Sequence, residues 1–383
     1  MPNFFSEARK RTQTMNWSFQ LGTIKGIKIK FHWTFIFVIV WGAFSLGTGS
    51  SMLGLLYGAL LTVLVFVIVL LHELGHSLVA MAFGISVRDI TLLPIGGMAR
   101  LERMPNKPWQ EFLVAVAGPA VNFVLAAAIF PFLFIPVLAG EHRLSHLLFA
   151  PSVSPTIWSF LQFLFLVNVS LLLFNLLPAF PMDGGRMFRA LVAMAVGMYR
   201  ATKVAVWLGQ GIAFVMAGYA IWSGQLILLL IALFIFSAGS AEKRAIEVRE
   251  ALANIRTGDV VNGLMNVLLP SYTLGEVAGL ALRSPVGSYP VVLGGTLLGV
   301  LRRSDVKRAL NRGQRLSTVA EVMQRHFPKV DITTSLADVH EAFERDGTSV
   351  AAVYSDGQLV GLIDAEDMDR AYQLNKRARF RWA

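Results

Sequence analysis

The sequence predicts a multi-pass α-helical membrane protein with about six transmembrane helices, followed by a soluble α/β domain. Of its 383 residues, 55% are hydrophobic and only 15% are charged, whereas about 25% of the residues in an ordinary soluble domain are charged. Long uncharged runs fill the first two thirds of the chain, and the last third has a soluble composition. The low charge and the 27 phenylalanines also exclude an intrinsically disordered chain.

Six apolar segments account for the predicted transmembrane helices, because a spanning helix needs about 20 mostly apolar residues. They are residues 33–48, 53–83, 110–139, 157–178, 204–222 and 225–240. The last two share one uncharged run, which is too long for a single helix of ordinary tilt and breaks at Ser223 and Gly224. Residues 186–203 carry four basic side chains, so we expect this segment at the membrane interface.

Charges in the loops predict the orientation of the spans. Residues 1–250 carry 18 Lys and Arg against 10 Asp and Glu, whereas residues 251–383 carry 16 against 14. Basic residues are abundant in alternate loops and nearly absent from the others, as expected for six spans with both termini in the cytoplasm. The net charge of +10 therefore follows the membrane topology, and we expect the lipid bilayer as a partner and no nucleic acid. No cleavable signal peptide or organelle signal is evident, which favours the cell membrane of a prokaryote.

The second apolar segment contains the motif His72-Glu73-x-x-His76. Its two histidines are four residues apart, so both face one side of a helix and can bind one metal ion, while Glu73 can act as general base on the metal's water. This is the zinc-hydrolase pattern, and a chain without cysteine has no thiolate ligand or cysteine nucleophile to offer instead. The alternative is a polar patch that packs helices, which is a costly use of ionisable groups in a membrane.

A catalytic zinc site keeps three protein ligands and an open position, so a third ligand must lie at a similar depth. Asp183 is the first acidic residue after residues 147–182, which carry no charge, and it lies at the end of the fourth span. Spans two and four run in the same direction in the predicted topology, so His76 and Asp183 both lie toward the cytoplasmic side. Asp183 is therefore the candidate third ligand beside His72 and His76, which would give one zinc per chain. The alternative for Asp183 is a helix N-cap.

Residues 91–100, which follow the zinc motif, combine an apolar run with Gly96 and Gly97 and predict a strand or hairpin. Peptide bonds are cleaved in extended form, so an exposed strand edge here could pair with an unwound substrate. The alternative is a plain loop.

The zinc motif and the later Asn175-x-x-Pro-x-x-Pro-x-Asp183-Gly-Gly together resemble the site-2 protease family of intramembrane zinc metalloproteases, over roughly residues 20–245. The resemblance implies zinc bound at the three predicted ligands, with Glu73 as general base. It also implies cleavage of a peptide bond within or near a transmembrane segment of another protein, often a membrane-bound regulator. Zinc would lower the pKa of its water and polarise the carbonyl, and Glu73 would pass the proton to the leaving amine.

Two asparagines are candidate substrate contacts. Gly118-Pro119-x-x-Asn122 in the third span resembles a further motif of the family, which implies that Asn122 binds substrate or the oxyanion. From its position alone, a hydrogen bond between helices is an equal alternative. Asn175 is expected to orient substrate or a ligand, and a polar contact between helices is nearly as good an explanation.

Residues 246–383 show an internal duplication with a period near 60 residues. Each copy has an apolar strand, a glycine turn, a second strand and a helix. The two copies resemble a pair of CBS repeats at 257–312 and 317–374, so the soluble part is expected to be an α/β CBS-pair domain. The resemblance implies regulation of the protease and association of two chains.

The resemblance also implies an adenine nucleotide in the CBS pair, with Asp305 and Asp367 at its ribose. The usual threonine three residues earlier is Arg302 in the first repeat and Asp364 in the second. Asp364 would disfavour a nearby phosphate, so a dimerisation or gating module without a ligand is an equal alternative.

The predicted organisation is an N-terminal cytoplasmic segment, a six-helix protease domain, two CBS repeats and a basic tail. The bounds are 1–30, 31–245, 257–312, 317–374 and 375–383. Two alternatives to an intramembrane protease remain at this point. One is a metal-binding transporter or channel gated by the CBS pair, although no inverted repeat is visible. The other is an inactive scaffold, which the presence of both ligands and base argues against.

Overall fold

The computed structural model describes residues 18–47, 51–94, 96–101, 105, 107–140, 156–263, 266–283 and 286–380. Residues 1–17 of the predicted N-terminal segment and residues 381–383 of the predicted tail lie outside this part of the chain, as do the side chains of residues 376–380. The described residues divide into two compact units between residues 244 and 245. Each unit is described separately.

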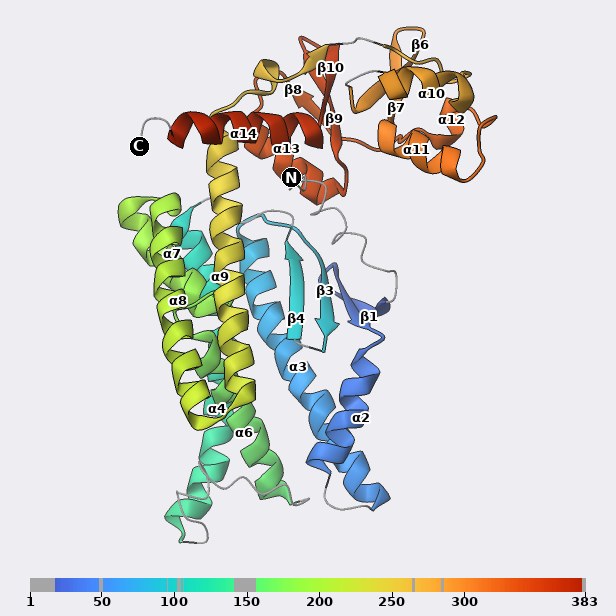
Figure 1. The fold of residues 1–383 in the computed structure, drawn as a ribbon. Coiled ribbons are helices and arrows are strands. Elements are labelled where there is room, and N and C mark those ends of the chain that lie inside the picture. The colour runs from blue at the N-terminus through green and yellow to red at the C-terminus, as the bar shows by residue number, and fades with distance from the viewer. Residues whose placement is uncertain are drawn as a thin grey trace. The chain divides into compact units, whose positions relative to one another are not determined.

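Seven helices are described in the part of the chain from residue 18 to residue 253 (Figure 1). They are α2 (Phe35–Leu46), α3 (Met52–Ala82), α4 (Pro108–Leu138), α6 (Ile157–Asn175), α7 (Asp183–Val196), α8 (Met198–Ser223) and α9 (Leu226–Ala253). Within the described residues, five are long and apolar enough to cross a membrane: α3, α4, α6, α8 and α9. Helix α7, which covers part of the basic segment, is not among them, as its charges predict.

The first predicted span differs from the expectation of a full transmembrane helix. Its helical part, α2, has 12 residues, which at 1.5 Å per residue gives about 18 Å, well short of a hydrocarbon core of about 30 Å. Two turn residues separate it from strand β2 (Ile27–His32). The apolar run of 33–48 therefore predicts a helix correctly but not its length.

Local signals explain where the long helices begin and end. Ser51 caps α3 by accepting a hydrogen bond from the backbone N–H of Gly54, and Thr156 caps α6 in the same way. Helix α8 ends at Gly224, which has a φ of 69° in the left-handed region that favours glycine. The predicted break between the last two spans is therefore present, and α9 continues beyond the predicted end at residue 240.

A four-stranded sheet lies beside α3 in the first unit (Figure 1). Its strands occur in the order β1 (Ser18–Ile24), β2, β3 (Val87–Leu93) and β4 (Gly96–Leu101). Strands β2 and β3 are parallel, and β3 and β4 form a hairpin in which Leu93 pairs with Gly96. The strand or hairpin predicted for residues 91–100 is therefore present, and β4 is an edge strand.

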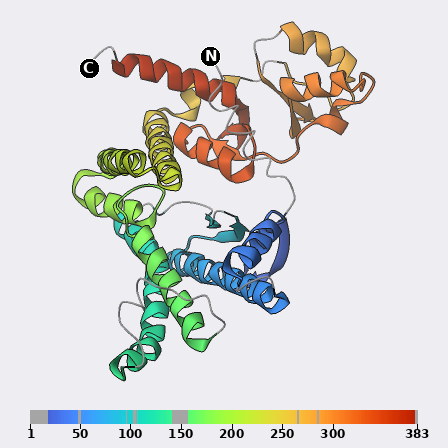
Figure 2. The ribbon, with the colours of Figure 1, turned by 60° about the horizontal axis from the view of Figure 1, so that its bottom comes forward.

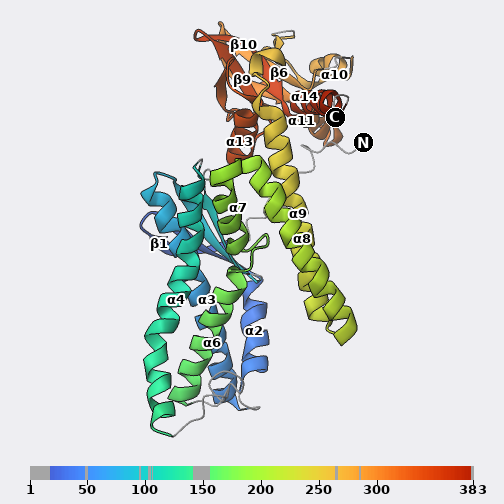
Figure 3. The same cartoon turned by 90° about the vertical axis from the view of Figure 1, so that its left-hand side faces the viewer.

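Helix α3 is central to the first unit. It packs against α2 on one side and α4 on another, and α4 also packs against α6 and α7 (Figure 2). The sheet contacts α3 through a small apolar core that includes Leu74 and Ile90. Helices α8 and α9 form an antiparallel pair, seen from the side in Figure 3. This arrangement brings the face of α3 that carries the zinc motif between α4 and the start of α7.

The second unit contains the predicted duplication. The first copy has α10 (Leu274–Arg283), β6 (Ser288–Leu293), β7 (Thr296–Arg302) and α11 (Arg303–Asn311). The second has α13 (Leu336–Asp346), β9 (Val350–Ser355), β10 (Gln358–Asp364) and α14 (Ala365–Phe380). Shorter elements are a 3₁₀ turn at Thr257–Asp259, β5 (Asn262–Gly263), α12 (Val319–Val322) and β8 (Lys329–Asp331). Each copy has its own apolar core, and a third cluster joins Val300 to Val350, Ala352 and Leu362 across the two copies.

Candidate metal centre

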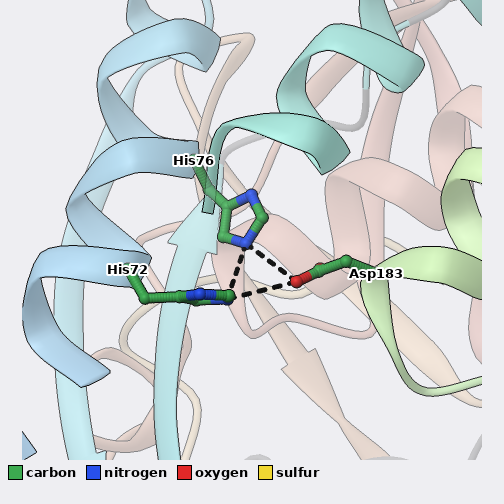
Figure 4. A group of neighbouring side chains, drawn as sticks. All are labelled: His72, His76 and Asp183. Carbon is green, nitrogen blue, oxygen red and sulfur yellow. Dashed lines mark hydrogen bonds and ion pairs between the residues drawn. The ribbon is translucent and has the colours of Figure 1, made fainter. Parts of the chain in front are cut away.

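Three of the predicted site residues meet at one point in the first unit (Figure 4). His72 and His76 project from successive turns of α3, and Asp183 is the first residue of α7. The two histidine Nε2 atoms are 3.1 Å apart, and Oδ2 of Asp183 lies 3.1 Å from one and 3.2 Å from the other. Asp183 is 111 and 107 residues away from them in the chain, so the tertiary fold creates this cluster.

Hydrogen bonds on the far side of each imidazole set its orientation. Nδ1 of His76 lies 2.6 Å from the backbone carbonyl of Val114, which can only accept, so this nitrogen carries the proton. Nδ1 of His72 lies 2.5 Å from the carboxamide oxygen of Asn122 and donates in the same way. In the neutral imidazoles, both Nε2 atoms therefore direct lone pairs toward the carboxylate of Asp183.

Two nitrogens and one carboxylate oxygen in this arrangement suit zinc. Tetrahedral ligands with bonds of about 2.0–2.1 Å lie about 3.3–3.4 Å apart, close to the three observed separations. The three side chains are largely buried, with 7%, 12% and 13% of their surface exposed. Three acceptor atoms buried at such short distances repel one another unless a cation lies among them. Among the described residues, this is the one group of three or more His, Cys, Asp or Glu side chains that could hold a metal ion.

Gly118 of α4 borders the site closely. A Cβ atom at this position would lie 2.2 Å from Nε2 of His76 and 2.7 Å from Nε2 of His72, which is closer than atoms approach. Glycine is therefore the residue that allows α4 to approach the metal-binding nitrogens. The sequence singles out this glycine only as part of the motif before Asn122.

Glu73 lies on α3 next to the ligands and beside the edge strand β4. A Cβ atom at Gly97 would lie 2.6 Å from Cγ of Glu73, so the strand backbone passes directly against this side chain. Gly96 begins the strand with a φ of 137°, which lies in the range that favours glycine. The predicted base and Gly97, one of the two predicted substrate-binding glycines, are thus neighbours.

Asn122 contacts both the zinc motif and a neighbouring helix. It is completely buried behind His72, and its Nδ2 donates to Oδ1 of Asn168 on α6 at 3.0 Å. It thus makes the contact between helices that its position alone suggested, in addition to the bond to His72. Asn175 is half-buried, and its Nδ2 donates to the backbone carbonyl of Leu171 on its own helix.

An ion cluster formed by two buried side chains and one partly exposed side chain was not anticipated from the sequence. Nε of Arg189 on α7 donates to Glu111 of α4 at 2.9 Å, and the guanidinium also contacts Glu242 of α9. Burial alone lowers the pKa of Arg189, but the two carboxylates more than offset this effect, so the pKa lies above its usual value. The sequence does contain a signal for this cluster: one arginine and two acidic residues lie in largely apolar helices, where charged side chains require partners of opposite charge.

Asp305 in the second unit is engaged by the protein itself. Arg302 forms a two-point contact with its carboxylate, with Nε at 2.7 Å and Nη2 at 3.0 Å, and Arg308 also contacts it. Burial raises the pKa of Asp305, and the two arginines lower it by more, so the pKa lies below its usual range. Both oxygens of this carboxylate therefore already accept hydrogen bonds from arginine.

Asp367, its counterpart in the second repeat, accepts a hydrogen bond from the backbone N–H of Asp364 at 3.1 Å and contacts Arg370. The two repeats also exchange bonds. Arg302 donates to Ser349 of the second repeat at 2.9 Å, and Asp364 accepts from Ser288 of the first at 3.0 Å. With both aspartates engaged and a second carboxylate at Asp364, these residues do not fit an adenine nucleotide well.

Comparisons with known proteins identify both units. The chain matches peptidase family M50 over residues 60–149 and 138–218, and the CBS domain over residues 255–312 and 319–373. A zinc metalloprotease of Methanocaldococcus jannaschii is 31% identical over 362 residues, which cover 94% of this chain and 97% of that protein. Stage IV sporulation protein FB of Bacillus subtilis is 32% identical over 154 residues, 40% of this chain and 47% of that protein.

Among solved structures, a site-2 protease from Methanocaldococcus jannaschii is 32% identical. The match covers 60% of this chain and 96% of that chain, with a TM-score of 0.40.

Proposed function

The chain belongs to peptidase family M50, the site-2 proteases, and is a membrane metalloprotease with a CBS pair; we propose that it hydrolyses a peptide bond within or near a transmembrane segment of another membrane protein. The observation that carries the proposal is the convergence of two imidazole nitrogens and a carboxylate oxygen beside Glu73 and the edge strand β4. Membership of the family favours hydrolysis over the transporter and scaffold alternatives.

The residues that would hold zinc are His72, His76 and Asp183. Zinc in such a site lowers the pKa of a water molecule and polarises the scissile carbonyl. Glu73 would take the proton from the attacking water and later donate it to the leaving amine, because it follows His72 directly on α3. Val114 and Asn122 keep the histidine tautomers that leave both Nε2 lone pairs free.

The edge strand β4 is the proposed place for the substrate backbone. A transmembrane helix hides its carbonyls in internal hydrogen bonds, so the substrate must unwind before cleavage. An extended segment can add to a sheet edge through main-chain hydrogen bonds, and at Gly97 the backbone of this edge strand passes directly against Glu73. Asn175, half-buried at the end of α6, is a proposed substrate contact. For Asn122, the hydrogen bond to His72 supports a role in orienting that histidine rather than in contacting substrate.

The finer points of topology and regulation are also proposals. Loop charges support a cell-membrane protein with cytoplasmic termini in a prokaryote, with the protease domain at 31–245 and the CBS repeats at 257–312 and 317–374. The CBS pair would regulate the protease and associate with a second chain. The contacts that already engage Asp305 and Asp367 argue against an adenine nucleotide, so ATP and AMP should not bind to the full chain in equilibrium dialysis. Clear binding of either nucleotide would reverse this view.

The proteolytic function is tested by comparing wild type with Glu73→Gln in one bacterial host. Mass spectrometry of the membrane fraction should find new peptide termini within or near transmembrane segments, and only in cells with the wild-type protein. Zinc content measured on both purified proteins shows whether the variant is still loaded. Identical termini in the two strains, with zinc bound in both proteins, would contradict the proposal.

A further inference from the structure

One face of α4 holds the metal centre from behind. Glu111, Val114, Gly118 and Asn122 follow one another at intervals of three, four and four residues, so they lie along one side of the helix. The last three contact the histidines, through the Val114 carbonyl, the bare Cα of Gly118 and the Asn122 carboxamide. The first, Glu111, instead contacts Arg189 of α7. The same face of α4 thus reaches both helices that supply metal ligands.

Arg189 is the side chain that joins α7 to that face. It is only 6% exposed, and its guanidinium donates to Glu111 of α4 and Glu242 of α9. It lies six residues after Asp183 on the same helix, about 9 Å along its axis. We call Arg189, Glu111 and Glu242 the Arg189 clamp.

The clamp also contacts the loop that leads into Asp183. The guanidinium of Arg189 lies over the ring of Phe180, 5.0 Å from its centroid, and Phe180 is buried in the loop between α6 and α7. That loop has two prolines, which cannot donate backbone hydrogen bonds. Its internal backbone bonds include Ala179 to Leu177 and Met182 to Ala179. Arg189 therefore restrains Asp183 from both sides, through the helix after it and the loop before it.

We propose that Arg189 is a positioning residue that sets the distance of the Asp183 carboxylate from His72 and His76. The histidines are fixed to α4 by their own hydrogen bonds, whereas within the described part of the chain the side chain of Asp183 bonds to the histidines and not to α4, so its place depends on that of α7. The Arg189–Glu111 contact supplies that placement. This inference rests on the proposed metal centre, and it adds a residue that does not touch the metal or the substrate.

The deciding experiment compares metal affinity and cobalt spectra of the full-length protein in detergent. Arg189→Lys keeps the positive charge but loses the planar fork that bridges Glu111 and Glu242. Its affinity for Zn²⁺, measured by competition with a chelator, should fall about 10- to 100-fold, as when other residues that orient metal ligands are lost. The visible spectrum of its Co²⁺ form should shift toward that of Asp183→Ala.

Two further variants separate positioning from simple loss of stability. The triple variant Arg189→Met, Glu111→Gln and Glu242→Gln removes the buried charges together, so no carboxylate is left without a partner. Its affinity for Zn²⁺ should fall by at least as much as that of Arg189→Lys. Arg200→Met is the matched control, because Arg200 is an exposed arginine on α8 with no ion pair to any described residue; its affinity and spectrum should equal those of wild type.

The outcomes are distinct. If Arg189→Lys folds and binds Zn²⁺ within about threefold of wild type with an unchanged Co²⁺ spectrum, the inference is wrong. If Arg189→Lys does not fold, Arg189 has a general structural role and the inference is also wrong. If wild type itself binds no metal, the proposed metal centre fails, which is a different result from a loaded wild type with equally loaded variants.

Discussion

The carboxamide oxygen of Asn122 lies 2.5 Å from Nδ1 of His72, and the same side chain donates to Asn168 on a third helix. A relay of two amides thus links α6 and α4 to the zinc motif on α3. Because Nδ2 of Asn122 is occupied by Asn168, its oxygen is the atom that faces His72. The relay therefore fixes both the ring orientation of His72 and the nitrogen that carries its proton.

Replacement of Asn122 should weaken metal binding. In Asn122→Ala, the buried Nδ1–H of His72 loses its acceptor, so the ring can rotate or change tautomer. We expect a 10- to 100-fold loss of Zn²⁺ affinity, the size typical for residues that orient a metal-bound histidine, measured by chelator competition. Asn175→Ala is the control, because Asn175 bonds only to its own helix among the contacts described, and should bind Zn²⁺ as wild type does. Unchanged affinity in Asn122→Ala would return Asn122 to the role of a substrate contact.

Gly118→Ala should disrupt the centre more directly. Its methyl group would lie 2.2 Å from Nε2 of His76, so the imidazole must leave the position from which it faces Asp183. We expect Zn²⁺ to bind at least about tenfold more weakly, with the protein still helical by circular dichroism. Gly211→Ala on α8 is the matched control, because no atom lies within 4 Å of its added methyl group. Equal zinc content in the two variants would mean that His76 is not a ligand in this position.

Substitutions at Glu73 and Asp183 should separate zinc binding from catalysis. Glu73→Gln keeps the side-chain volume and the three ligands, so it should bind about one zinc per chain while its turnover falls by about 10²–10⁴-fold, the usual worth of a general base. Asp183→Ala removes a ligand and should lose zinc as well as activity. Elemental analysis beside a cleavage assay distinguishes the two variants. Zinc retained at full affinity by Asp183→Ala would exclude Asp183 from the ligand set.

The sequence predicts those parts of the site that local spacing encodes. The separation of His72 and His76 by four residues determines a shared helix face, and Gly224 determines where α8 stops. Asp183 could be chosen because a long uncharged stretch precedes it. Each of these signals lies within one segment, so no tertiary information is needed to find it.

The remaining parts depend on contacts between distant segments. The acceptor for His76 is the backbone carbonyl of Val114, which any residue could provide, so no sequence pattern marks it. Glu111 and Arg189 are 78 residues apart, and only the crossing of α4 and α7 makes them partners. Helix α2 begins two residues after the start of the predicted span 33–48 and ends two residues before its end, because an apolar composition does not mark the first and last residues of a helix.

Gly97→Ala should impair turnover without loss of metal. The added methyl group would lie 2.6 Å from Cγ of Glu73, so the base must move away from the ligands or the strand edge must move outward. A displacement of about 1 Å at a reacting group costs on the order of 10²-fold in rate, whereas His72, His76 and Asp183 are not touched. Gly22→Ala on β1, the other edge of the sheet, has no atom within 4 Å of its methyl group and serves as control. Wild-type turnover in Gly97→Ala would argue against close contact between β4 and Glu73 during catalysis.

Low pH should destabilise the first CBS repeat by protonating Asp305. Its pKa is lower in the folded chain than in the unfolded chain, because Arg302 and Arg308 stabilise the carboxylate by more than burial destabilises it. The resulting stability is fully present above the unfolded pKa of about 3.9 and is lost as the pH falls through the lower, folded value.

Arg302→Met removes the two-point contact, so the pKa of Asp305 rises and α11 should lose protection at a higher pH than in wild type. Hydrogen exchange of α11 in the full-length protein, corrected for the intrinsic effect of pH, measures this shift. Arg312→Met, which removes an exposed cation with no ion pair to a described residue, should exchange like wild type. The same acid transition in Arg302→Met and wild type would mean that the fork on Asp305 contributes nothing to the stability of the repeat.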